Sequence, residues 1–188
     1  MKKQVLFIHG GGDDSDEAYK ADSILAKSLQ KALGDSYDVS FPRLKEENLP
    51  DFGWPRQISE EINKIGEDLL LVGHSLGASM MLKYLSEMQV SKKIKAVYLL
   101  APPHWTGNED WKQGLKLQND FAEKLPVDIP IFLYQCMDDD TVPYSHYTWY
   151  VQMLAHATVH AMKNGGHQFN DDLDFLAKDI KELRSFPA

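Results

Sequence analysis

Cysteine, positive charge and long apolar runs are all scarce in this sequence. The 188 residues include one cysteine, Cys136, so a disulfide within the chain is excluded. No apolar run approaches the roughly 20 residues of a membrane-spanning helix, and the run after Lys2 and Lys3 is too short for a secretory signal. We therefore expect a cytoplasmic protein that does not enter a membrane, with Cys136 as a buried structural thiol.

Basic residues are outnumbered by acidic ones. There are 20 lysines and arginines against 28 aspartates and glutamates, which gives a net charge of −8 and an isoelectric point near 5.3. Such a surface repels nucleic-acid phosphates and anionic lipid headgroups, so we expect neither as a partner. The length suits one domain spanning residues 1–188, with a sizeable core.

Motifs for nucleotide phosphates and for metal ions are also missing. The glycine run at residues 10–12 lacks the Lys-Ser/Thr ending of a P-loop, and G-x-G-x-x-G fails because residue 15 is serine. His156 and His160 fall on one face of a predicted strand, without a third ligand at a suitable spacing. We expect neither a metal ion nor an organic cofactor.

What the chain does carry is a serine between two glycines where a strand should meet a helix. Ser75 stands in G-H-S-L-G (residues 73–77), after the apolar residues 69–72 and before an amphipathic stretch. A sharp strand-to-helix turn pushes the serine hydroxyl out of the sheet, within reach of a base. Side chains at positions 73 and 77 would collide with the neighbouring strand or helix. The alternative is a glycine-rich turn without chemistry.

Two later segments supply an acid and a base in a defined chain order. A predicted strand at residues 129–136 runs into the aspartates at 138–140, and one at residues 157–162 leads to His167. The order Ser, Asp, His is that of α/β-hydrolases. Histidine would take the serine proton, and a carboxylate would hold the imidazole tautomer. Alone, His167 could be a loop histidine and the acids a solvated cluster; with Ser75, catalysis is favoured.

Backbone donors for an oxyanion can also be placed. The first predicted strand, residues 5–8, ends in H-G-G-G at residues 9–12, which matches an esterase-type oxyanion loop. We place one donor at the N–H of Gly11, with Gly12 as the alternative. The second is the N–H of Leu76, at the positive end of the helix after the serine.

The sequence resembles the α/β-hydrolase superfamily, and within it the small bacterial serine hydrolases of the retinoblastoma-binding-protein type. The resemblance runs from the His-Gly pair at residues 9–10 through the serine pentapeptide to the Gly-His pair at residues 166–167. In that superfamily the acid commonly precedes Val-Pro by three residues, and counting back from Val142 gives Asp139. The Leu-x-Cys-x-Glu binding motif of the human relative is missing here, so that interaction is not implied.

Strands and helices alternate along the whole chain, which predicts an α/β fold with a parallel sheet between two layers of helices. The resemblance implies six strands in the order 2-1-3-4-5-6, with the serine strand beside the first. The predicted helices begin after Asp14, at Pro55 and after Ser75, and two more cover residues 110–125 and 170–183.

Residues 104–126 form the one insertion with a distinct character, a short lid-like segment expected to overhang the site. His104 and Trp105 could line an acyl pocket or could simply pack a short loop. Trp54 poses the same alternative.

Together these features predict a serine hydrolase that cleaves a small-molecule carboxylic ester through an acyl-enzyme. Ser75 attacks, His167 serves as base and then acid, and Asp139 orients His167. A thioesterase or amidase would use the same residues, and a binding protein could keep the fold without turnover. Dehalogenases and epoxide hydrolases are disfavoured because their relatives carry aspartate at the position of Ser75.

Overall fold

The computed structural model describes residues 2–11, 15–90, 94–106 and 110–183. Its strands are β1 (Lys3–Ile8), β2 (Tyr37–Ser40), β3 (Leu69–His74), β4 (Ile94–Leu100), β5 (Ile131–Cys136) and β6 (Thr158–Met162). Its α-helices are α1 (Ser15–Leu33), α2 (Trp54–Lys64), α3 (Leu76–Glu87), α4 (Phe121–Lys124), α5 (Tyr144–Met153) and α6 (Asp174–Glu182). Two 3₁₀ turns, η1 (Asp110–Leu115) and η2 (Phe169–Asp171), complete the described elements.

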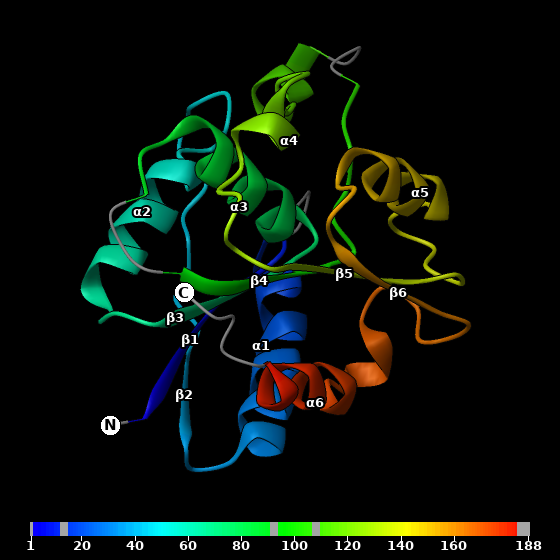
Figure 1. Cartoon of the computed structure of the whole chain (residues 1–188). Coiled ribbons are helices and arrows are strands. Elements are labelled where there is room, and N and C mark those ends of the chain that lie inside the picture. The colour runs from blue at the N-terminus through cyan, green and yellow to red at the C-terminus, as the bar shows by residue number, and fades with distance from the viewer. Residues whose placement is uncertain (1, 12–14, 91–93, 107–109, 184–188) are drawn as a thin grey trace.

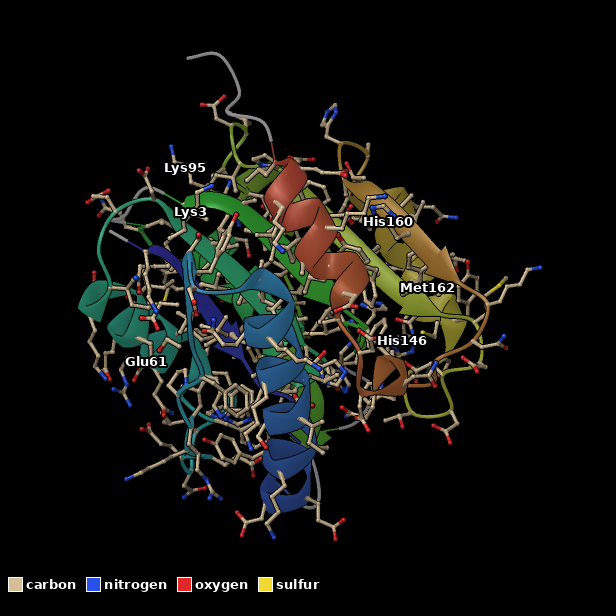
Figure 2. All side chains as sticks on the ribbon, turned by 90° about the horizontal axis from the view of Figure 1, so that it is seen from below. Lys3, Glu61, Lys95, His146, His160 and Met162 are labelled. Carbon is tan, nitrogen blue, oxygen red and sulfur yellow. The ribbon has the colours of Figure 1, made fainter. Side chains whose placement is uncertain are left out.

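The strands form one parallel sheet in the order β2-β1-β3-β4-β5-β6. Helices α1 and α6 cover one face, and α2, α3, α4 and α5 cover the other (Figure 1). Figure 2, from below, shows α1 and α6 over their face, with His160 and Met162 on β6 across the sheet from Lys3. The predicted α/β class, layers and strand order are confirmed.

Side chains alternate along the strands between two apolar cores. On β1, Leu6 and Ile8 join the core under α2 and α3, whereas Val5 and Phe7 join the core under α1 and α6. A parallel sheet is buried on both faces, so its strands are apolar throughout. All carboxyl ends of parallel strands lie at one edge, and the predicted site residues follow those ends. Within the described ranges, no helix is both long enough and apolar enough to cross a lipid bilayer.

The single helix predicted over residues 110–125 is wrong. The structure has η1 and then α4, joined by non-helical residues. Gly114 packs directly against the backbone of Pro50, where a Cβ atom would clash. Leu115 and Leu117 are both buried although they lie two residues apart, a spacing that suits an extended chain rather than one face of a helix. A tertiary contact therefore overrides the local pattern.

The last helix begins later than predicted, at Asp174 rather than Asn170. Phe169, Asn170 and Asp171 have φ values of 51°, 54° and 57°, so the chain makes a left-handed turn before α6. Right-handed helix cannot start until that turn ends. This turn connects the segment that carries His167 to α6.

Candidate active site

Ser75 occupies the sharp turn that its sequence predicted. It lies between the end of β3 and the first residue of α3, with φ 50° and ψ −125°. Such a backbone conformation is costly for a residue with a Cβ and persists only where close packing enforces it. A Cβ on Gly73 would lie 2.7 Å from the Cα of Ala78, and one on Gly77 would meet the carbonyl oxygen of His9. The expected collisions with helix and strand are therefore present.

An acid and a base meet beside this turn. Asp139 follows β5 and His167 follows β6, and the parallel pairing of these strands carries both residues to one edge. The Nδ1 atom of His167 lies 2.9 Å from Oδ2 of Asp139. A carboxylate accepts hydrogen bonds, so Nδ1 is the ring nitrogen that donates to Asp139 and Nε2 is the one that does not face this acid. The contact fixes the orientation of the His167 ring relative to Asp139.

Asp139 is held as a carboxylate by its surroundings. The N–H groups of Val142 and Thr141 donate to Oδ1 at 2.8 and 2.9 Å, and Gln135 Nε2 donates to Oδ2 at 2.7 Å. Burial by itself raises the pKa of Asp139, but the hydrogen bonds from His167 and the Val142 N–H lower that pKa below its ordinary value. A lowered pKa favours the ionised carboxylate of Asp139, which is the form that accepts a hydrogen bond from His167.

The neighbouring aspartates have other contacts. Asp138 accepts the N–H groups of Gly165 and Gly166 at 3.2 and 2.9 Å, which fixes the turn before His167. Asp140 is exposed and accepts the hydroxyl of Thr141 at 3.2 Å. The structure thus brings Asp139, rather than Asp138 or Asp140, to the imidazole of His167.

The glycine loop after β1 passes over the serine turn. A Cβ on Gly10 would lie 3.1 Å from the Cβ of Ser75, and one on Gly11 would lie 2.8 Å from Leu76 Cδ2. The N–H of Gly10 is already bound, since it donates to Asp22 Oδ2 at 2.6 Å. Gly11 and Leu76, the two predicted oxyanion donors, are therefore neighbours. The alternative donor, Gly12, lies outside the described residues.

A serine hydrolase family model matches residues 13–177. The chain belongs to the serine hydrolase family. No curated protein sequence matches the chain. One similar solved structure is the ydeN gene product of B. subtilis, with 19% identity over 97% of this chain and 98% of that chain and a TM-score of 0.72. A second is the CarC serine hydrolase involved in carbazole degradation, with 12% identity over 96% of this chain and 90% of that chain and a TM-score of 0.73. A third is Est1E from Butyrivibrio proteoclasticus, with 15% identity over 96% of this chain and 86% of that chain and a TM-score of 0.68. At these identities the likeness shows the α/β-hydrolase fold, which confirms the resemblance drawn from the sequence.

This serine hydrolase also contains a second His–Asp contact that the sequence analysis missed. Nδ1 of His74, the residue before the serine, lies 2.8 Å from Oδ1 of Asp22 on α1, and both side chains are 1% exposed. The signal was available, because Asp22 lies on the same helical face as the buried Leu25 and Leu29. An acid on an apolar helix face needs a buried partner, but the sequence alone did not identify His74, 52 residues away.

His104 packs against Trp149 of α5, and Trp105 packs against the core of this serine hydrolase, so their role in an acyl pocket stays a prediction. The His104 ring stacks on Trp149 with centroids 3.6 Å apart, and the main-chain N–H of His104 donates to His146 Nδ1 at 2.9 Å. Burial lowers the pKa of His104 below its ordinary value. Trp105 is partly buried against the core under α2 and α3. Trp54 is fully buried and contacts the His9 ring edge-on at 5.0 Å.

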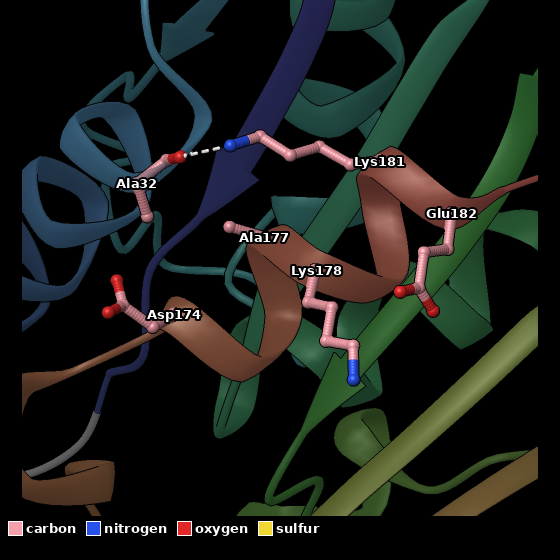
Figure 3. A pocket seen from close by; sticks show the side chains of 6 residues that line it. All are labelled: Ala32, Asp174, Ala177, Lys178, Lys181 and Glu182. Atoms are coloured by element: carbon pink, nitrogen blue, oxygen red, sulfur yellow. Dashed lines mark hydrogen bonds between the residues drawn. The ribbon is translucent and has the colours of Figure 1, made fainter.

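Two surface hollows lie away from these residues. One of about 500 Å³ lies between α1 and α6, lined by Ala32, Lys178 and Lys181 among others, and Lys181 Nζ donates to the Ala32 carbonyl at 2.6 Å (Figure 3). The other, of about 310 Å³, lies beside Cys136 and Phe169. In the described part of the chain, no group of three or more His, Cys, Asp or Glu side chains could hold a metal ion. His156 precedes β6 rather than sharing its face with His160.

Proposed function

We propose that the chain hydrolyses small carboxylic esters through an acyl-enzyme formed on Ser75. The observation that carries the proposal is the 2.9 Å contact between His167 Nδ1 and Asp139, beside a serine with φ 50° at a strand-to-helix turn. That combination supplies an activated nucleophile and an oriented base. The family supplies the reaction class, hydrolysis.

The proposed reaction has two halves. Ser75 Oγ attacks the ester carbonyl while His167 Nε2 takes the hydroxyl proton, and the carbonyl oxygen becomes an oxyanion bound by the N–H groups of Gly11 and Leu76. The C–O bond to the alcohol then breaks, and His167 returns the proton to that alcohol. Water repeats the sequence on the acyl-enzyme and releases the acid and free Ser75. Asp139 stays ionised and pairs with the imidazolium.

Esters are favoured over amides and thioesters by the similar structures. One solved structure holds ferulic acid bound to Est1E, and another is an esterase domain from Rhodothermus marinus. A small acyl group is favoured by residues 104–126, whose Leu115, Phe121 and Leu125 are buried. We expect a segment of this length, with those side chains held in the core, not to enclose a fatty acyl chain. The small ester is the proposed partner, and a cytoplasmic location stays a prediction.

A covalent fluorophosphonate probe tests the nucleophile. We expect the wild type to be labelled at Ser75, and Ser75→Ala to lose labelling and about four orders of magnitude in ester turnover, because the triad acts as a unit. The folded state of the variant is checked by circular dichroism. Labelling that moves to another serine would contradict the assignment, and an unlabelled wild type would support the non-catalytic binding protein.

A substrate panel tests the leaving group and the acyl length. We expect p-nitrophenyl acetate and butyrate to be cleaved faster than the palmitate ester, without a jump in rate when substrate micelles form, because each extra methylene can gain at most about 0.8 kcal/mol of burial. Matched acetyl thioester and anilide substrates separate the esterase from the thioesterase and amidase alternatives. A rate that rises steadily with chain length would contradict the small acyl pocket.

A further inference from the structure

Asp22 joins three separate parts of the chain through one buried carboxylate. Its Oδ2 accepts the N–H of Gly10 at 2.6 Å, and its Oδ1 lies 2.8 Å from His74 Nδ1. Gln168 Nε2 also donates to Oδ1, at 3.3 Å. The partners come from the loop after β1, the end of β3 and the segment after β6. A carboxylate with 1% exposure is costly unless its acceptor sites are filled in this way.

His74 continues the connection on its other side. Its Nε2 lies 3.0 Å from the main-chain carbonyl oxygen of His167. A carbonyl oxygen only accepts, so Nε2 carries a proton. The pKa of Asp22 is lowered, so its carboxylate is ionised and has no proton to donate; Nδ1 therefore donates to it. A ring with both nitrogens protonated is an imidazolium, and the contact is a buried ion pair.

The charges around His74 agree with that protonation state. Burial of the ring opposes its charge, but the carboxylate of Asp22 raises the pKa of His74 above its ordinary value, with a smaller contribution from Asp139. The His167 ring also faces it, with centroids 4.6 Å apart. Burial by itself raises the pKa of Asp22, but the charge of His74 and the hydrogen bonds from His74, Gly10 and Gln168 together lower that pKa below its ordinary value.

We propose that Asp22 and His74 are positioning residues, a buried carboxylate–imidazolium pair that ties the Gly10–Gly11 oxyanion loop to the main chain of the base His167. This inference rests on the proposed function. The hydrogen bonds of the pair go to the main chain of Gly10 and of His167. We infer that the pair acts by holding these two loops in place.

The sheet order explains why hydrogen bonds between the oxyanion loop and the His167 segment are needed. The oxyanion loop follows β1 and the base follows β6, and β3, β4 and β5 lie between these two strands. Strand pairing alone therefore leaves the two loops independent of each other. Asp22 and His74 connect them through hydrogen bonds at 2.6, 2.8 and 3.0 Å. A displacement of about 1 Å between catalytic groups can cost about 100-fold in rate.

Steady-state kinetics of Asp22→Asn test the inference, with Asp179→Asn as the matched control. Asp179 on α6 accepts the Tyr134 hydroxyl at 2.7 Å and lies 3.5 Å from His160 Nε2, on the same side of the sheet as Asp22. We expect Asp22→Asn to lower kcat for p-nitrophenyl acetate 10- to 100-fold, with KM within about twofold. Asp179→Asn should keep the wild-type kcat even where its melting temperature falls. An Asp22→Asn variant that loses stability but keeps kcat would overturn the positioning role.

The protonation state of His74 gives a measurement on the wild type that does not need a folded variant. In ¹⁵N-histidine-labelled protein at neutral pH, we expect both ring nitrogens of His74 to carry protons. A spectrum with one protonated ring nitrogen would overturn the ion pair. Wild type that is neither labelled by fluorophosphonate nor active would overturn the proposed function, whereas active wild type with unimpaired Asp22→Asn overturns only this inference.

Discussion

At the scale of single residues, three adjacent aspartates differ in what their carboxylates contact. Asp139 is buried at His167, Asp138 accepts two glycine N–H groups, and Asp140 is exposed. Removing the charge of each therefore has a different consequence. The same amide substitution at all three positions compares them with little change in volume.

We expect Asp139→Asn to lower kcat by about three to four orders of magnitude, because an amide in place of the carboxylate can hold the imidazole in the wrong tautomer. Asp138→Asn should cost about tenfold or less through a looser turn at Gly165 and Gly166, and Asp140→Asn should behave as the wild type. Ester hydrolysis with equal amounts of folded protein measures all three. If Asp138→Asn proves the most damaging, the role of Asp139 is misassigned.

The site residues differ in how far the sequence could predict them. Ser75 and Asp139 follow from short local patterns, a glycine-flanked serine and an acid three residues before Val142. The helical spacing of Asp22 marks it as an acid on an apolar face but does not identify its partner, because His74 is 52 residues away and is reached only through the packing of α1 on the sheet. Local spacing records local geometry, whereas a buried polar contact between distant elements depends on the whole fold.

At the scale of elements, the start of α3 packs against the end of β1 at Gly77. A Cβ on Gly77 would meet the carbonyl oxygens of Ile8 and His9, and these are backbone atoms that cannot turn aside. Helix α3 can therefore start beside β1 only while residue 77 lacks a side chain. The six strands could be predicted because each is a local apolar run. The non-helical segment at Gly114 could not, because a contact with the backbone of Pro50 decides it. The turn at Asn170 could not either, because it depends on a positive φ of 54°.

We expect Gly77→Ala to lower the free energy of unfolding by about 1–3 kcal/mol, the usual cost of forcing a methyl group into a full space. Gly66→Ala is the control, because a Cβ there meets nothing within 4 Å. It should leave the free energy of unfolding near the wild-type value. Urea denaturation followed by circular dichroism measures both, and equal stability of the two variants would refute the close approach of helix and strand.

At the scale of the whole molecule, the pair of Asp22 and His74 makes stability depend on pH. The folded pKa of Asp22 lies below its ordinary 3.8, so its contribution is complete above that pH and is lost as the pH falls through the folded pKa. The folded pKa of His74 lies above its ordinary 6.5, so its contribution is complete below that pH and is lost as the pH rises through the folded pKa. Both contributions are therefore complete between the two ordinary pKa values, 3.8 for Asp22 and 6.5 for His74.

We expect the difference in free energy of unfolding between wild type and His74→Gln to be largest between about pH 4 and pH 6.5, and to shrink above about pH 7. Burial lowers the pKa of His9, which acts in the opposite sense by weakening the fold as the pH falls below 6.5. His9 is common to both proteins, so the difference removes its effect. A difference that grows with pH above neutrality would contradict a charged His74.

The buried thiol of Cys136 lies under the segment that leads to His167, so its reactivity can be used to follow movements there. Its Sγ lies 3.7 Å from the Asn164 carbonyl oxygen and directly under Gly165, and burial raises its pKa to about 11. The surface hollow beside Cys136 is also lined by Asn164 and Phe169, so a movement of the chain before His167 would open the sulfur to an alkylating reagent. The chain has one cysteine, so the alkylation rate of the native protein reports the exposure of this one thiol.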